Sequence, residues 1–142
     1  MDTILVAIDF SKSSELLVDH AINLAKGLVS SIYLLHVVSP NEDISGREIK
    51  DEASEISKIY AKEIELLNGL AQTVRGHDID THAIFAEGGV VEAIREEATS
   101  VKADLIIAGT PGHNELEDLF LVSVSHGLVK HAPCPVLLVP TK

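Results

Sequence analysis

The sequence has few aromatic residues and a single cysteine. Phe, Tyr and Trp make up 4% of the 142 residues, and Trp is absent. Proteins that bind single-stranded nucleic acid stack its bases on aromatic side chains, so this scarcity argues against that class. The single cysteine, Cys134, excludes a disulfide within the chain,. Because Cys134 lies between two prolines ahead of an apolar run, we interpret it as a packing residue,.

Positive charge is also scarce. The chain has 11 Lys and Arg residues against 22 Asp and Glu residues, a formal net charge of −11 at pH 7. Such a surface repels nucleic-acid phosphates and anionic lipids, so we expect no nucleic acid partner and no membrane partner. No apolar run reaches the roughly 18 residues that indicate a membrane span, and the first residues lack the features of a secretory signal,. We therefore expect a cytoplasmic protein.

Hydrophobic residues are abundant but occur in short runs. At 46% of 142 residues they suffice for one buried core, so we predict a single domain over residues 1–142,. Five short runs predict strands, and several of them are continuously apolar, as in strands buried on both faces. These runs are Ile4–Ile8, Ile32–Val38, Thr81–Ala86, Leu105–Ala108 and Val136–Val139.

Helical patterns separate the predicted strands. Apolar residues recur at spacings of three and four over Leu17–Leu28, Glu48–Arg75 and Val91–Val101,. A shorter helix is predicted over Ser123–Lys130, where two prolines follow,. The alternation predicts an α/β fold, a five-stranded parallel open sheet with helices on both faces.

Ligands of such sheets bind at the carboxyl ends of the strands. Asp9 follows the first strand and can accept hydrogen bonds from a ribose or an adenine amino group, or can cap the next helix; both interpretations stay open,. His36 lies inside an apolar strand, and we interpret it as a histidine with a partner in the core or at its rim. Gly88 and Gly89 predict a tight turn into the third helix,.

The most informative segment is Asp104–Gly112. An apolar strand leads to Gly109 and Gly112, and Ser123 and Ser125 follow after a short loop. Backbone N–H groups and hydroxyls at a strand, a glycine turn and a helix start can bind a phosphate. Val122 stands where a third glycine would let a phosphate approach the backbone most closely,.

Motifs for catalysis are weak. The sequence contains neither a P-loop nor the glycine pattern of dinucleotide-binding folds,. His113, His126 and His131 lack the i, i+4 spacing of metal ligands on a helix, so we predict no metal site,. The pair Glu96 and Glu97 lies on a predicted helix surface. Without an evident acid and base, we predict that the protein is not an enzyme.

Taken together, these segments resemble a small single-domain member of the universal stress protein family. The resemblance rests on Ile4–Ser11, Leu34–Val38, Ala103–Gly109 and Val129–Val139. It implies a Rossmann-like three-layer sandwich of the adenine nucleotide alpha-hydrolase type and a homodimer formed through the last strand. One branch of the family binds ATP or AMP through a G-x-x-G-x9-G-[ST] pattern, and the other lacks the pattern.

Gly109, Gly112 and Ser123 match this pattern, and Val122 departs from it. The resemblance implies an adenine-nucleotide site, for which we select Asp9, Val38, Gly109, Gly112, Val122, Ser123 and Ser125. The branched side chain of Val122 narrows the approach of a phosphate.

The loop before Val122 is acidic. Each carboxylate of Glu115, Glu117 and Asp118 would oppose a triphosphate by about 1 kcal/mol, unless a divalent cation bridges them,. AMP is therefore favoured over ATP, and Mg²⁺ is expected only with ATP.

The last strand, Val136–Val139, predicts assembly. As an edge strand it would expose unpaired backbone groups and apolar side chains, which pairing with a second copy would cover,. Cover by the preceding helix is the alternative.

Three functional hypotheses follow. The favoured one is a non-enzymatic, dimeric stress-response protein that senses adenine nucleotides. The alternative is an interaction module whose vestigial pocket binds no nucleotide. A nucleotide hydrolase is disfavoured, because the phosphate loop has no basic residue and no general base is evident,.

Overall fold

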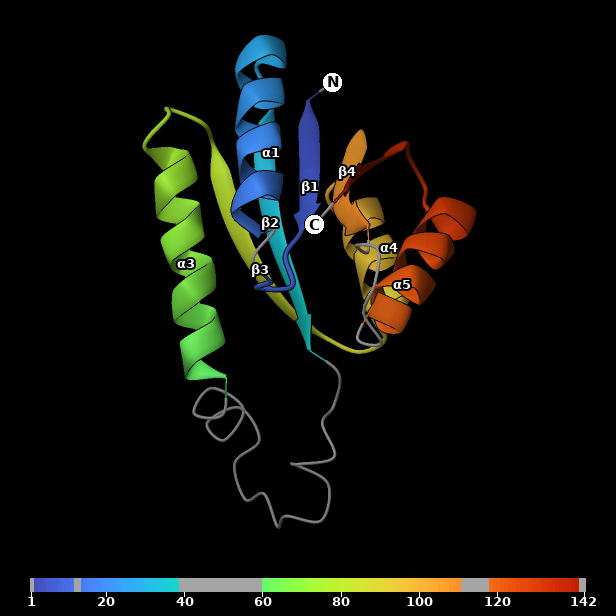
Figure 1. Ribbon diagram of the computed structural model, residues 1–142. Coiled ribbons are helices and arrows are strands. Elements are labelled where there is room, and N and C mark those ends of the chain that lie inside the picture. Colours follow the sequence, from blue (N-terminus) through green and yellow to red (C-terminus); the bar gives the residue numbers. More distant parts are fainter. Residues whose placement is uncertain (1, 12–13, 39–59, 111–117, 141–142) are drawn as a thin grey trace.

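A computed structural model describes residues 2–11, 14–38, 60–110 and 118–140, with only the backbone of residues 118–123 (Figure 1). Strands and helices alternate along the described chain. In order they are β1 (Thr3–Ala7), α1 (Ser14–Leu28), β2 (Ser31–Val38), α3 (Ala61–Arg75), β3 (Thr81–Glu87), α4 (Val90–Ser100), β4 (Leu105–Thr110), α5 (Asp118–His131) and β5 (Val136–Pro140).

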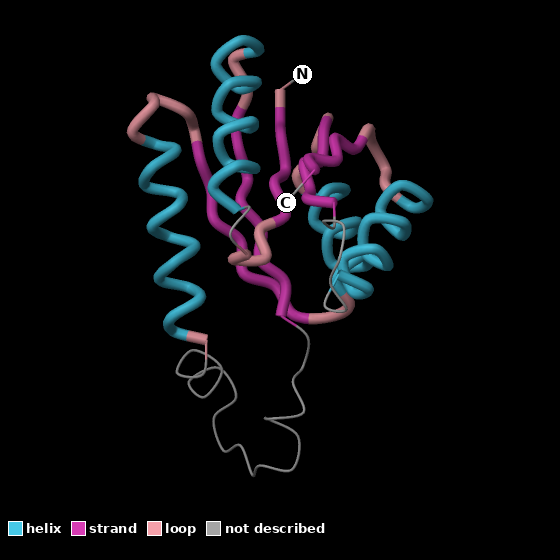
Figure 2. The backbone as a smooth tube through the Cα atoms, in the orientation of Figure 1, coloured by secondary structure: helices cyan, strands magenta, loops and turns pink. Residues whose placement is uncertain are grey.

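The strands form one five-stranded sheet in the order β3-β2-β1-β4-β5, and every neighbouring pair is parallel. Helices lie on both faces of this sheet (Figure 2). The predicted α/β fold is therefore confirmed. The N-terminal strand β1 lies at the centre and pairs with β2 on one side and β4 on the other, so the chain reverses its direction of winding at β1.

Two apolar layers hold the helices to the sheet. On one face, Leu17 of α1 and Leu67 of α3 pack with Ile4, and all three are almost fully buried. On the other face, Ile94 of α4 and Leu128 of α5 belong to a second buried cluster. Successive strand residues alternate between the two layers because side chains along a strand point to opposite faces.

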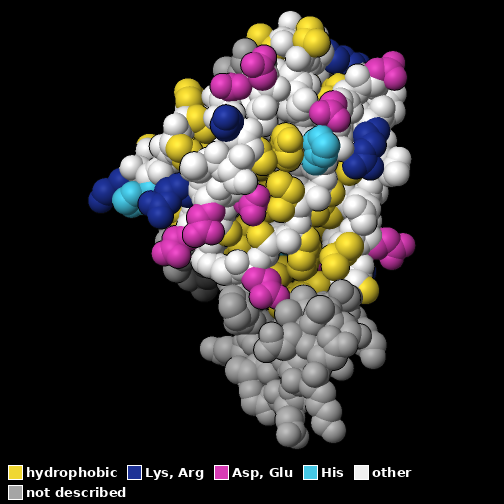
Figure 3. Space-filling model, turned by 180° about the vertical axis from the view of Figure 1, so that it is seen from behind, with side chains coloured by type: hydrophobic (Ala, Val, Ile, Leu, Met, Phe, Trp, Pro, Cys, Tyr) yellow, Lys and Arg dark blue, Asp and Glu magenta, His cyan; other side chains and the backbone are white. Residues whose placement is uncertain are grey.

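The second face is less completely covered. Tyr33, Val37, Ile84 and Ala86 of β2 and β3 pack against the second cluster but stay partly exposed. Figure 3 shows hydrophobic side chains at the centre of this side of the molecule, with acidic side chains around them. No helix in the described part of the chain is both long and apolar enough to cross a membrane.

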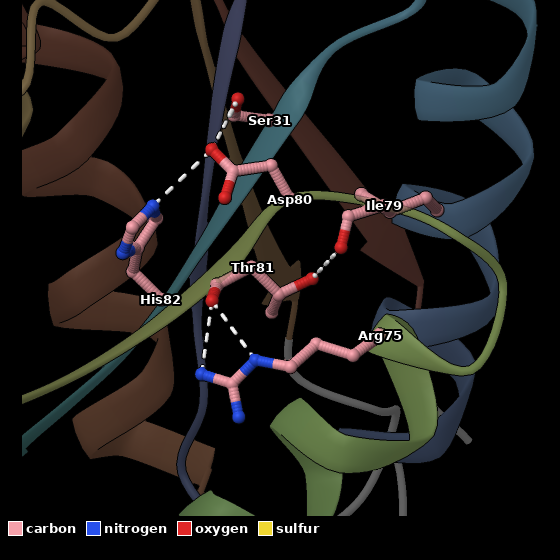
Figure 4. Close-up of polar contacts among 6 residues, drawn as sticks. All are labelled: Ser31, Arg75, Ile79, Asp80, Thr81 and His82. Carbon is pink, nitrogen blue, oxygen red and sulfur yellow. Dashed lines mark hydrogen bonds and ion pairs between the residues drawn. The ribbon is translucent and has the colours of Figure 1, made fainter.

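A polar network ties the amino ends of β2 and β3 together (Figure 4). Arg75 donates to the Thr81 carbonyl from Nε and Nη2, at 3.1 and 2.9 Å. Asp80 accepts from the Ser31 hydroxyl at 3.0 Å and lies 3.2 Å from Nε2 of His82. The hydrogen bond from Ser31, then that from His82, holds the pKa of the Asp80 carboxyl below its usual value. The network fixes the loop that enters β3. It lies at the amino ends of the strands, whereas ligands are expected at their carboxyl ends.

One helix boundary differs clearly from the sequence prediction. We predicted a helix over Ser123–Lys130, whereas α5 begins at Asp118. The physical reason is that the apolar segment 119–122 contains no glycine or proline, so helical structure continues through it,. Ser123 is therefore an interior residue of α5. The predicted helix over Glu48–Arg75 is described only in its second half, as α3.

Candidate functional site

A cavity of about 230 Å³ opens at the carboxyl ends of the central strands. It lies at β1 and β4, where the strand order switches, the place at which open parallel sheets bind ligands,. Its lining comes from β1, β2, β4, α4, α5 and the residues after β1: Ala7, Ile8, Asp9, Leu35, His36, Val37, Val90, Ile94, Ala108, Gly109 and Val124.

The cavity wall is mainly apolar. Val90 and Ile94 of α4 and Val124 of α5 lie opposite the strand ends. Sequence analysis did not select these three residues for the site; of the three, only Ile94 belongs to the apolar spacing that predicted the helix over Val91–Val101. Such walls suit a flat, weakly polar ring rather than a phosphate.

Asp9 lies in this lining and also holds the turn after β1. Its Oδ1 accepts the Ser11 N–H at 2.9 Å and lies 3.5 Å from the Ser14 hydroxyl at the start of α1. Between them, Phe10 has a left-handed φ of 60°. Asp9 thus stabilises the approach to α1 and belongs to the cavity lining, and the prediction that it binds a ribose or an adenine amino group stays a prediction.

Gly109 and Ser125 are brought together. Gly109 lines the cavity near the end of β4, and the buried Ser125 hydroxyl donates to the Gly109 carbonyl at 3.2 Å. This bond attaches α5 to β4. Val38, by contrast, does not line the cavity; its side chain is buried, and its carbonyl accepts the Gly88 N–H at 2.9 Å.

The turn into α4 is as predicted. Gly88 has a φ of 133°, a backbone conformation that residues with a side chain rarely adopt. Gly89 is the residue before the first turn of α4,. The turn brings Val90 to the cavity.

The predicted phosphate-binding segment is described only in part. Gly112, Glu115 and Glu117 lie outside the described residues. Val122 and Ser123 lie inside α5 rather than at its start. In an α-helix, the N–H of such interior residues bonds to the carbonyl four residues earlier, so the prediction that these residues form a helix start is wrong.

The remaining candidate residues lie away from the cavity. His126 and His131 line a groove between α4 and α5, together with Arg95 and Lys130; His113 lies outside the described residues. Within the described ranges, no three His, Cys, Asp or Glu residues are grouped to hold a metal ion. Burial, and to a smaller extent the charge of Asp104, raises the pKa of the Cys134 thiol, which suits packing rather than nucleophilic reactivity.

Comparison with known proteins identifies the family. The sequence model described as the Universal stress protein family matches residues 1–140. A Staphylococcus aureus protein named as a universal stress protein is 33% identical over 142 residues, covering 98% of this chain and 84% of that protein.

Solved structures agree with this match. The protein MJ0577 has a TM-score of 0.82 at 25% identity, over 99% of this chain and 96% of that one. A protein of the universal stress protein family from Burkholderia pseudomallei has a TM-score of 0.76 at 24% identity, over 99% and 96%. The chain belongs to the universal stress protein family.

Proposed function

We propose that this protein is a non-enzymatic stress-response protein that binds an adenine nucleotide in the cavity at the strand ends. The observation that carries the proposal is the position of a mainly apolar cavity, with Asp9 among its lining residues, at the switch point of the sheet. We also propose that the chain is a single cytoplasmic domain over residues 1–142.

Ligands of structural relatives support this ligand class. Universal stress proteins have been solved in complex with cAMP, at 23% identity and a TM-score of 0.75, and with dAMP in Archaeoglobus fulgidus, at 20% and 0.68. A family protein of Arabidopsis thaliana was solved with AMP bound, at 19% and 0.70. At these identities the likeness concerns the fold, and the ligand enters here as a proposal.

The size of the cavity favours a small nucleotide. A volume of about 230 Å³ is below the roughly 300 Å³ at which ligand pockets usually begin, so it suits a base better than a whole triphosphate,. In the proposed pose, the base lies between the apolar helix walls and the strand ends, and Asp9 accepts a hydrogen bond from the adenine amino group or the ribose.

On the phosphate side, Gly109 would allow close approach of the ligand, and Gly112 stays a candidate residue. Val122 and Ser123 lie inside α5, so the helix uses their backbone N–H groups, and of these two candidates only Ser123 would offer a donor, its hydroxyl,. AMP is the favoured ligand because its charge is smaller and lies further from the acidic loop. Mg²⁺ is expected only with ATP.

A nucleotide titration followed by thermal unfolding tests the proposal. A ligand at 100 times its dissociation constant stabilises the folded state by about 2.7 kcal/mol, so AMP should raise the melting temperature. Asp9→Asn keeps an acceptor for the Ser11 N–H but removes the charge, and should weaken AMP binding about tenfold, the difference between charged and neutral hydrogen bonds,.

Asp19→Asn, on an exposed position of α1, is the matched control and should bind AMP like the unmodified protein. No melting shift with AMP, cAMP or ATP at millimolar concentration would favour the alternative, an interaction module with a vestigial pocket.

We propose further that the protein acts as a homodimer through β5. This strand is at the edge of the sheet, and the side chain of Leu137 is 37% exposed. Pairing with the same strand of a second copy would satisfy the open backbone edge, and Pro140 would limit the length of the ladder.

A further inference from the structure

We infer that His36 is a positioning residue of the proposed nucleotide pocket. Its Nδ1–H binds the carbonyl of Ile8 and so holds the backbone next to Asp9. The inference rests on the proposed function, and it concerns a side chain that the sequence pattern marked only as a strand histidine. Both His36 and Asp9 belong to the lining of the cavity.

The first observation is a short hydrogen bond. Nδ1 of His36 lies 2.7 Å from the carbonyl oxygen of Ile8. Because a carbonyl can only accept, Nδ1 carries the proton in this arrangement. The bond forms where the pairing of β1 with β2 ends: its register runs to Ala7, and the Ile8 N–H still reaches the Leu35 carbonyl at 2.8 Å. The imidazole therefore extends the connection between the two strands by one side-chain bond.

The second observation is the packing of the imidazole ring. Its centroid lies 4.3 Å from that of Phe10 and 5.7 Å from that of Phe85, and all three rings are half-buried. Phe10 needs such support because its φ of 60° lies in the left-handed region, which is unfavourable for a bulky residue,.

These contacts enclose Asp9 from both sides. His36 binds the carbonyl of the residue before it and packs on the side chain of the residue after it. The Asp9 carboxylate itself closes the turn onto the Ser11 N–H at 2.9 Å. With the backbone fixed before and after it, Asp9 keeps its place in the cavity lining before a ligand arrives, which reduces the ordering cost of binding,.

Two substitutions at His36, whose new side chains are similar in shape, distinguish the effect of the hydrogen bond from the effect of ring packing. His36→Asn removes the ring but keeps an amide N–H close to the position of Nδ1, whereas His36→Leu has a similar shape and no donor. We expect His36→Asn to bind AMP within about threefold of the unmodified protein, and His36→Leu to bind it about tenfold more weakly, as measured by calorimetry.

Amide hydrogen exchange at Ser11 supplies a readout that needs no ligand. Loss of the His36 bond should loosen the turn, so exchange of the Ser11 N–H should accelerate in His36→Leu and return toward the original rate in His36→Asn,. His82→Leu, near the amino end of β3 and stacked on Tyr33, is the control. It should change neither AMP affinity nor Ser11 exchange.

The outcomes are distinct. If AMP binds none of the proteins but Ser11 exchange follows the expected order, the proposed function fails and the positioning role of His36 stands. If His36→Leu matches the unmodified protein in AMP affinity and in Ser11 exchange, or if both His36 variants lose affinity equally, the inference about the Nδ1 bond is overturned.

Discussion

The hydroxyl of Ser125 connects two elements of the scaffold. Sequence analysis predicted Ser125 as a nucleotide-binding residue; in the structure the residue is 8% exposed and its hydroxyl donates to the Gly109 carbonyl. A hydroxyl used in this way is no longer free to donate to a phosphate. Its effect on the site is to hold α5 against the end of β4.

Ser125→Ala should therefore affect stability. We expect a loss of about 1 kcal/mol in the free energy of unfolding, because the hydrogen bond between α5 and β4 is lost,. Urea denaturation measures the change, and Ser100→Ala, at an exposed position, should have little effect. Unchanged stability together with weaker AMP binding would instead make Ser125 a ligand-binding residue.

Asp104 is a second residue with a structural role. Its Oδ2 accepts the backbone N–H groups of Asp2 and Thr3, at 2.8 and 3.1 Å. These two bonds, that of Asp2 first, hold the pKa of the Asp104 carboxyl below its usual value. They attach the start of β1 to the residue that precedes β4.

This lowered pKa predicts a pH dependence of stability. A carboxyl whose pKa is lower in the folded state stabilises the protein above its unfolded pKa, near pH 4, and this contribution is lost as the pH falls through the folded value,. Asp104→Asn should therefore lose less stability between pH 5 and pH 2 than the unmodified protein, as urea unfolding at each pH would show. Parallel curves for the two proteins would remove Asp104 from the explanation.

Among the secondary-structure elements, α4 and α5 make an unusually close contact. A Cβ atom added at Gly127 would lie 2.8 Å from Cγ2 and 3.3 Å from Cγ1 of Val91. The branched side chain of Val91 has little freedom to move away. The two helices that supply Val90, Ile94 and Val124 to the cavity thus approach each other because Gly127 has no side chain.

Two glycine-to-alanine substitutions test this contact. Gly127→Ala should lower the free energy of unfolding by about 1–3 kcal/mol through overpacking,. Gly69→Ala, inside α3 and with open space around its Cβ position, should raise it by about 0.5–1 kcal/mol through helix propensity,. Chemical denaturation measures both, and equal effects at the two positions would contradict a close helix contact.

Local sequence pattern predicts strand β3 better than the start of helix α5. The predicted run Thr81–Ala86 differs from β3 only by its last residue, Glu87, because β-branched and aromatic residues between turn residues favour a strand,. The predicted start of α5 at Ser123 was wrong, because the apolar residues before Ser123 also continue the helix,.

The candidate site was predictable only in part. Asp9 and Gly109 could be selected because each directly follows or ends an apolar strand run, and both line the cavity. The contact of His36 with Ile8 has no sequence signal, because it depends on strand register. The pairing of β1 with β4 joins segments about a hundred residues apart and follows from packing of the whole chain.

For the whole molecule, the proposed dimer gives a direct prediction. Leu137→Lys places a charge on the exposed side of the edge strand β5, and should convert a dimer to a monomer in light scattering at micromolar concentration,. Leu66→Lys, on an exposed position of α3, is the control and should leave the mass unchanged. A monomeric mass for the unmodified protein would end the dimer proposal.

The central place of β1 has a consequence for biosynthesis. Of the strands described, β1 is synthesised first and β2 follows it directly, but the other edge of β1 waits for Leu105–Ile107 of β4. Until those residues emerge, a nascent chain presents an open, apolar strand edge that is fully covered in the finished protein,. Although its central residues are fully buried in the finished protein, β1 is thus the strand that waits longest for its second partner and is open to mispairing during translation.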